Sequence, residues 1–313
     1  MIAFGPVPSR RLGRSLGINN IPPKVCTYSC VYCQVGKTSR MQVERCPFYE
    51  PDDIFKEVKK QIKKARMKGE AIDYLTFVPD GEPTLDINLG LEIDRLKTLG
   101  IKVAVITSGS LAFREDVKED LLKADWISLK LDSIWKTSWR KMNRPHTGLD
   151  LGSILTGMLN FSKMFNGDLV TETMLVRGMN TDSDMLQEMA QVLSKLNLKK
   201  AYLAIPTRPP AENWVHMPAP KDINMAFQIL RKKIDQVEYL IGYEGNAFAY
   251  TGNAENDLLS ITSVHPMRES AVSDLLTKAG ADWSVVDKLI AENKLVETEY
   301  ETHKFYLRHL SLE

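Results

Sequence analysis

The sequence predicts an α/β protein with parallel strands, followed by a small C-terminal domain. Between about residues 16 and 241, short apolar strands alternate with helical segments in six β–α repeats. A strand that returns to the same sheet through a helix lies parallel to the strand before it. Near residue 256 the alternation stops. Six repeats suit either a partial barrel or an open doubly wound sheet, and periodicity does not choose between them.

The expected elements follow one another along the chain. A helix begins at Pro51, with acidic residues in its first turn and lysines later, and ends before Gly69. A proline-rich loop at 206–220 interrupts the last repeat. The expected strands cover residues 16–18, 72–77, 101–107, 126–131, 169–176, 201–205 and 239–241, and the expected helices cover residues 51–67, 87–99, 113–123, 134–142, 149–165, 183–196 and 221–236.

We expect two domains, residues 1–250 and 251–313. The second domain is expected to be winged-helix-like, because helices near 268–279 and 283–292 precede a closing hairpin at 294–307. Such domains often bind DNA. Residues 256–313, however, hold six Lys/Arg and ten Asp/Glu, a net charge of −4. Since phosphate binding needs the opposite sign, DNA binding is not expected, and a protein-docking module, a lid or a packing element remain as alternatives.

Composition is ordinary for a globular protein of 313 residues, with 43% hydrophobic and 26% charged residues. No apolar run approaches the roughly 18 residues of a membrane span, and the start of the chain does not resemble a signal peptide. Four cysteines, three of them in one loop, do not form a disulfide framework. We therefore expect a cytoplasmic protein that does not enter a membrane.

The first 40 residues contain six Lys or Arg and no acidic residue. Such a segment could attract an anionic substrate or a reductant protein. It could equally neutralise thiolates, helix carboxylates or a cofactor, and the sequence leaves both possibilities open.

Cys26, Cys30 and Cys33 form a C-x3-C-x2-C motif, with Tyr32 directly before the last cysteine. Three thiolates on one loop can hold a single metal centre. Structural zinc usually takes four ligands in two C-x2-C pairs or with histidines. The next histidine lies far along the chain, although Cys46 could serve as a fourth ligand. Three thiolates on a 4Fe–4S cluster leave its fourth iron open. The spacing favours such a cluster, with a zinc-stabilised scaffold as an alternative.

The cysteine motif resembles that of the radical S-adenosylmethionine (radical SAM) superfamily. Residues 5–19 resemble the opening of a group of bacterial and archaeal members known only as Fe–S oxidoreductases, and the enzyme that makes the tricyclic base of wybutosine in tRNA is a more distant relative. The resemblance covers nearly the whole chain. It implies a partial (β/α)6 TIM-type barrel, a 4Fe–4S cluster on Cys26, Cys30 and Cys33, and S-adenosylmethionine on the open iron with Tyr32 near its adenine.

Further cofactor contacts are expected where strands end, since ligands bind beyond the carboxyl ends of parallel strands. Gly81, Glu82 and Pro83 belong to a turn that resembles the family's glycine- and glutamate-containing turn, which meets the amino group of the cofactor. Thr107 and Ser108 stand where relatives often have Thr-Asn. The resemblance therefore implies that all five contact the cofactor.

The next two strands carry polar residues at positions where a buried strand is usually apolar. Alternation places Ser128, Lys130 and Asp132 on one face, where they need polar partners. The ribose and carboxylate of the cofactor would supply these partners, or Lys130 and Asp132 would pair with each other. Glu172 and Met174 lie where the corresponding strand of the family touches the ribose or the substrate.

Loops expected on the same rim supply the candidate substrate contacts Arg144, His146, Arg208 and Glu244. The two arginines could clamp a phosphate or carboxylate, and His146 could act as an acid or base; each could instead be structural. Cys46 could donate a hydrogen atom to a substrate radical or be a small buried hydrophobe. The sequence holds no second cysteine cluster, which excludes subfamilies with auxiliary clusters.

The resemblance implies an enzyme. An electron from a ferredoxin- or flavodoxin-like donor would reduce the cluster, which would cleave S-adenosylmethionine to a 5′-deoxyadenosyl radical. That radical would abstract hydrogen from a tRNA nucleoside, a peptide side chain or a small metabolite. The alternative is an iron–sulfur sensor or regulatory binding protein with a winged-helix module. Such a protein should carry a basic recognition helix, which the sequence lacks.

Overall fold

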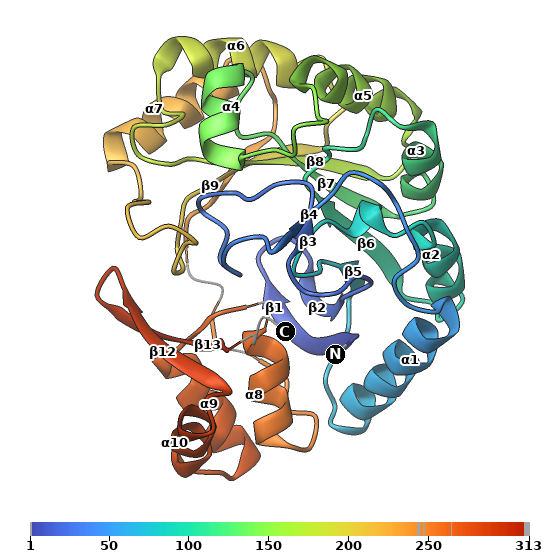
Figure 1. Ribbon diagram of the computed structural model, residues 1–313, viewed down its shortest axis with the longest axis vertical. Helices are drawn as coiled ribbons and strands as arrows, with labels where there is room; N and C mark the ends of the chain where they lie inside the picture. Colours follow the sequence, from blue (N-terminus) through green and yellow to red (C-terminus); the bar gives the residue numbers. More distant parts are fainter. Residues whose placement is uncertain (1, 243–244, 247, 264, 310–313) are drawn as a thin grey trace.

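An eight-stranded sheet forms the centre of the computed structural model, which describes residues 2–242, 245–246, 248–263 and 265–309. In spatial order its strands are β1 (Ala3–Ser9), β2 (Gly13–Ile18), β5 (Tyr74–Phe77), β6 (Lys102–Thr107), β7 (Trp126–Lys130), β8 (Asp168–Met174), β9 (Lys200–Ala204) and β10 (Val237–Leu240). Neighbours from β2 to β10 are parallel. The sheet curls into an open half-barrel (Figure 1). The expected partial barrel is confirmed.

Helices line the outer face of the half-barrel (Figure 1). Their apolar faces pack on the sheet in one core, as the β–α repeats require. The helices of these connections are α1 (Pro51–Met67), α2 (Leu89–Lys97), α3 (Glu115–Leu121), α4 (Lys136–Asn143), α5 (Leu151–Met164), α6 (Ser183–Leu193) and α7 (Pro220–Arg231). All expected strands and helices of this part are present, with ends shifted by a few residues.

The edge strand β1 is not among the strands expected from the sequence. It contains Pro6 and Pro8 and pairs antiparallel with β2. Proline lacks the N–H that a central strand must donate, but an edge strand has a neighbour on one side only and tolerates it. The prolines that exclude a helix here are therefore compatible with an edge strand.

Short elements surround the cysteine loop. β3 (Val25–Cys26) pairs with β4 (Arg40–Met41) in a two-stranded sheet. The 3₁₀ helix η1 (Pro83–Leu85) follows β5. Together they place the cysteine loop at the carboxyl ends of the parallel strands.

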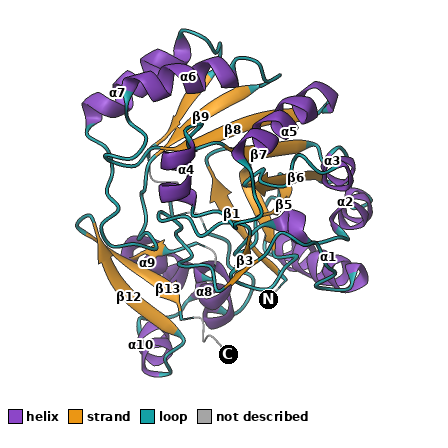
Figure 2. Ribbon diagram, turned by 45° about the horizontal axis from the view of Figure 1, so that its top comes forward, coloured by secondary structure: helices purple, strands orange, loops and turns teal. Residues whose placement is uncertain are grey.

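The C-terminal segment comprises α8 (Ala254–Thr262), β11 (Met267–Arg268), α9 (Glu269–Ala279), α10 (Ser284–Ala291), β12 (Leu295–Tyr300) and β13 (His303–Arg308). The expected order of two helices and an antiparallel hairpin is present. Membership of the winged-helix class and the domain boundary at 250 stay predictions. Phe4 and Val7 of β1 pack with Leu258 and Ile261 in one apolar cluster. The segment therefore lies against β1, beside the opening of the half-barrel (Figures 1 and 2).

Within the described parts of the chain, no helix is both long and apolar enough to span a bilayer.

Candidate functional site

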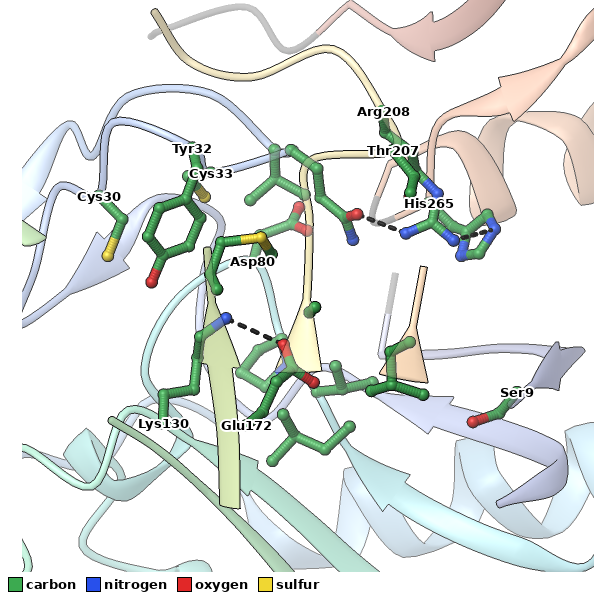
Figure 3. A pocket seen from close by; sticks show the side chains of 18 of the residues that line it. Ser9, Cys30, Tyr32, Cys33, Asp80, Lys130, Glu172, Thr207, Arg208 and His265 are labelled. Carbon is green, nitrogen blue, oxygen red and sulfur yellow. Dashed lines mark hydrogen bonds and ion pairs between the residues drawn. The ribbon is translucent and has the colours of Figure 1, made fainter. Parts of the chain in front are cut away.

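A cavity of about 320 Å³ lies at the carboxyl ends of the parallel strands, where ligands bind in this architecture. Figure 3 shows side chains from the cysteine loop, the strand ends and the C-terminal segment around it. The expected site residues that line it are Cys26, Cys30, Tyr32, Cys33, Gly81, Lys130, Glu172, Met174 and Arg208. One cavity thus brings together residues from most of the length of the chain.

Backbone hydrogen bonds to the end of α4 hold the cysteine loop. The N–H of Ser29 donates to the carbonyl of Asn143 over 3.0 Å, and the N–H of Val31 donates to that of Met142 over 2.9 Å. The Asn143 amide nitrogen also lies 3.4 Å from Cys30 Sγ. The loop is therefore attached to the barrel on both sides of Cys30.

The three cysteines are free thiols, each half-buried. Burial raises the pKa of Cys30 to about 12, with Asp132 and Cys33 adding to the effect. Burial, followed by the Glu82 carboxylate, raises the pKa of Cys26. Such thiols stay protonated until a metal replaces the proton.

The donor set fits an iron–sulfur cluster. Three cysteine sulfurs from one loop are soft ligands of the kind that such clusters require. In the described part of the chain, no three His, Cys, Asp or Glu side chains are grouped to hold a single metal ion. Cluster ligands bind different irons and need not converge on one point.

Gly81 allows the turn after β5 to pass directly beside the cysteine loop. A Cβ at this position would lie 1.9 Å from the carbonyl oxygen of Val25. On either side of the contact, Glu82 N donates to Val25 O over 3.1 Å and Lys24 N donates to Asp80 O over 2.8 Å. Only glycine fits this approach, and the two backbone hydrogen bonds join the loop to the turn.

Glu82 connects the turns after β5 and β6. Its carboxylate accepts hydrogen bonds from Thr84 N (3.1 Å) and Thr84 Oγ1 (2.6 Å), from Thr107 Oγ1 (2.5 Å), and from Ser108 N (2.8 Å) and Ser108 Oγ (2.6 Å). These three expected site residues, Glu82, Thr107 and Ser108, therefore meet one another. Neither these three residues nor Pro83 is among the residues that line the cavity, and their cofactor contacts stay predictions.

Glu172 lies between two cations. Lys130 Nζ is 3.1 Å from Glu172 Oε1, and Arg11 Nη1 binds Glu172 Oε2. Burial alone would raise the pKa of Glu172. The positive charges of Arg11 and Lys130 have the larger combined effect and lower this pKa to about 2. Burial also opposes the charge of Lys130, but Glu172 and Asp132 raise its pKa overall. Lys130 Nζ additionally lies 4.9 Å from the centre of the Tyr32 ring. A charged network thus lines the middle of the cavity.

Asp132 supports Tyr32 instead of pairing with Lys130. It accepts hydrogen bonds from the Tyr32 hydroxyl, from Asn143 Nδ2 over 2.7 Å and from Met174 N over 2.8 Å. The expected alternative of a Lys130–Asp132 pair is wrong, because the register of β7 and β8 puts Glu172 opposite Lys130. Asp132 and the fully buried Ser128 do not line the cavity.

Of the expected substrate contacts, Arg208 lines the cavity. Arg144 instead pairs with Glu212 over 2.5 Å. His146 Nδ1 accepts a hydrogen bond from the N–H of Gly148 over 3.1 Å, and neither Arg144 nor His146 lines the cavity. Glu244 lies outside the described residues. The backbone just before Arg144 thus supports the cysteine loop, because the carbonyls of Met142 and Asn143 accept hydrogen bonds from Val31 and Ser29.

Two cavity residues carry no sequence signal that marks them as site residues, apart from their nearness to the motifs. Lys24 is 8% exposed, and its Nζ has no hydrogen-bond partner among the described residues. Burial lowers the pKa of Lys24, while Cys33 and Asp80 oppose that effect. Asp80 is 3% exposed, and burial raises its pKa to about 7. Both lie at the cysteine end of the cavity, where sequence spacing did not predict two buried ionisable side chains.

The described Cys46 does not line the cavity. Its sulfur accepts a hydrogen bond from Gln42 Nε2 over 3.7 Å. Nothing in this placement supports hydrogen-atom donation by Cys46.

Comparison with known families matches residues 20–193 to the radical SAM superfamily. The chain belongs to this superfamily. This radical SAM protein is 46% identical over 311 residues to "UPF0026 protein MJ1312" of Methanocaldococcus jannaschii, covering 99% of this chain and 96% of that protein. The membership and the shared fold identify it as a radical SAM enzyme, and the family implies S-adenosylmethionine and an iron–sulfur cluster.

Solved structures share the fold of this radical SAM enzyme. A radical SAM methyltransferase from Sphaerobacter thermophilus is 16% identical with a TM-score of 0.58, covering 72% of this chain and 66% of that one. Streptococcus suis SuiB bound to S-adenosylmethionine is 12% identical with a TM-score of 0.52, covering 71% of this chain and 49% of that one.

Proposed function

We propose that this enzyme holds a 4Fe–4S cluster on Cys26, Cys30 and Cys33 and binds S-adenosylmethionine in the adjoining cavity. The observation that carries the proposal is that all three thiols of one loop line one end of a cavity at the carboxyl ends of the strands. The fold is shared with SuiB, whose structure was solved bound to S-adenosylmethionine. When bound, the reduced cluster supplies the electron that cleaves S-adenosylmethionine to methionine and a 5′-deoxyadenosyl radical, which takes a hydrogen atom from the substrate.

The residues of the cavity orient the cofactor. Lys130 presents an ammonium that can bind a carboxylate, and Glu172 presents acceptors for hydroxyl groups. Tyr32 offers an aromatic face next to Lys130, and Asp132 holds the Tyr32 hydroxyl in place. Because these groups are fixed by hydrogen bonds before a ligand arrives, binding costs little reorganisation.

Two parts of the proposal concern partners. A ferredoxin- or flavodoxin-like protein supplies the electron. The substrate is a tRNA nucleoside, a peptide side chain or a small metabolite with an unactivated C–H bond.

The test is an anaerobic assay for 5′-deoxyadenosine. The full chain is reconstituted with iron and sulfide, reduced with dithionite and incubated with S-adenosylmethionine, and the product is detected by mass. Cys30→Ala should abolish iron binding and product while the protein stays folded. Cys46→Ala is the matched control, because Cys46 lies away from the cavity, and it should keep both.

Product formation by the unaltered protein but also by Cys30→Ala would show that the ligand assignment is wrong. No product and no change in the EPR spectrum on adding S-adenosylmethionine would favour the sensor alternative. Zinc at one per chain without iron, after anaerobic purification, would contradict the whole proposal.

A further inference from the structure

Lys24 enters the cysteine end of the cavity from an unusual backbone position. It lies two residues before Cys26, and its φ of 64° falls in the left-handed region, which glycine adopts more easily than lysine. Its N–H donates to the carbonyl of Asp80 over 2.8 Å, and its carbonyl accepts hydrogen bonds from the N–H groups of Ser39 and Arg40, each over 3.1 Å. The backbone at Lys24 is thus fixed by three hydrogen bonds. A lysine held in this conformation points to a role for its side chain.

The ammonium of Lys24 is buried with its donors unused. The residue is 8% exposed and lines the cavity, and Nζ has no hydrogen-bond partner anywhere in the part of the chain that the structure describes. Lys130, which also lines the cavity, differs because its Nζ lies 3.1 Å from Glu172 Oε1. An ammonium carries three N–H donors, and burying them without acceptors costs free energy. An acceptor on a bound group would offset that cost.

The cysteine loop folds against this ammonium. A Cβ on Gly36 would lie 3.4 Å from Lys24 Nζ, and the N–H of Gly36 donates to the carbonyl of Cys33 over 3.1 Å. Nζ therefore lies against the turn that directly follows Cys33. Burial lowers the pKa of Lys24, while Cys33, then Asp80 and then Cys26 raise it.

Two kinds of acceptor thus face the ammonium, cysteine sulfur and the carboxylate of Asp80. Cys33 and Asp80 lie at the same end of the cavity (Figure 3). Asp80 Oδ1 is buried and accepts no hydrogen bond from any described residue, so it does not engage the donors of Lys24. The sulfur of Cys33 is the other acceptor beside the ammonium. Once iron replaces the thiol proton, that sulfur carries negative charge and becomes a stronger acceptor.

We propose that the Lys24 ammonium donates a hydrogen bond to sulfur at the Cys33 side of the cluster and thereby raises the reduction potential of the cluster. The inference rests on the proposed function, because it takes the cluster ligands from there. Hydrogen bonds to the sulfurs and nearby charge are two of the means by which a protein sets a cluster potential. An added electron makes the cluster more negative, so a neighbouring ammonium stabilises the reduced form more than the oxidised form. Lys24 is therefore a residue that tunes the cluster without being its ligand.

The test is a redox titration of the reconstituted full chain without S-adenosylmethionine, in which EPR measures the fraction of reduced cluster. Lys24→Met removes a charge-assisted hydrogen bond. It should lower the ratio of reduced to oxidised cluster at a given potential by about tenfold, which is a fall of about 59 mV in the midpoint of a one-electron couple. Lys24→Gln keeps an N–H donor without the charge and should give a smaller fall.

Lys37→Met is the matched control on the same loop. Lys37 does not line the cavity, and its side chain is 64% exposed and pairs with Glu212 over 3.2 Å. Because solvent and salt screen an exposed charge, the midpoint should stay unchanged in this variant. Asp80→Asn separates an effect on the cluster from an effect on the neighbouring carboxylate. Lys24→Met should still lower the midpoint when it is added to Asp80→Asn.

A midpoint that falls in Lys24→Met and not in Lys37→Met supports the inference. An unchanged midpoint in Lys24→Met, an equal fall in both lysine variants, or loss of the effect in the Asp80→Asn background overturns it. An unchanged midpoint with weaker binding of S-adenosylmethionine would assign Lys24 to the cofactor and would also overturn it. If Lys24→Met takes up no iron, Lys24→Gln decides by the same criterion.

Failure of this inference is distinguishable from failure of the proposed function. An unaltered protein that forms no iron–sulfur cluster would contradict the proposed function. A normal cluster whose midpoint does not depend on Lys24 would contradict this inference alone.

Discussion

Gly81→Ala should separate the cysteine loop from the barrel. The added methyl carbon would lie 1.9 Å from the carbonyl oxygen of Val25 and 2.9 Å from Ile21 Cδ1. Since real contacts of this kind are rarely under 3.0 Å, the loop and the turn must move apart by about 1 Å. Backbone atoms on both sides make this movement costly.

The size of the effect follows from what the movement breaks. Overpacking at a tight site costs about 1–3 kcal/mol. The hydrogen bonds from Glu82 N to Val25 O and from Lys24 N to Asp80 O span the contact, and each contributes about 1 kcal/mol. We expect Gly81→Ala to lower the free energy of unfolding by about 3–5 kcal/mol, which combines these two contributions.

Urea unfolding of the cluster-free protein measures the loss, and iron per chain after anaerobic reconstitution measures the effect on the loop. Gly242→Ala is the matched control, because a Cβ there would meet nothing within 4 Å. If Gly81→Ala unfolds within about 0.5 kcal/mol of the control and binds the same iron, the steric reasoning is refuted.

Two further predictions concern buried charges. Lys24→Met should raise the free energy of unfolding of the cluster-free protein, since an apolar side chain replaces a buried ammonium without a hydrogen-bond partner among the described residues; urea unfolding checks this, and a decrease would contradict it. Burial, and then the nearby Asp86, raises the pKa of Glu92, so the folded chain keeps a proton that the unfolded carboxyl releases above about pH 4. The free energy of unfolding should therefore fall as pH rises from about 5 to 9, and Glu92→Gln should flatten that slope; a slope unchanged in the variant would exclude Glu92 as its source.

The sequence alone determined the features that depend on near neighbours in the chain. The spacing of Cys26, Cys30 and Cys33 places three sulfurs on one loop, and a loop that short brings its ligands together in any fold. The alternation of strands and helices can be read from the local pattern of apolar residues. In a half-barrel wall, each helix has one apolar face and each strand is covered on both sides, and both patterns are visible in short segments. The cysteine spacing also carried the resemblance that the family match confirmed.

Tertiary structure decided which distant polar groups meet. Lys130 pairs with Glu172 because β7 and β8 align them, and alternation within one strand could not show that register. Arg208 meets His265 because the C-terminal segment packs on Phe4 and Val7 of β1. Periodicity says that a helix has an apolar face but not what covers it. The three cysteines of the site could therefore be predicted from the sequence, whereas the contact between Arg208 and His265 depends on segments far apart in the chain.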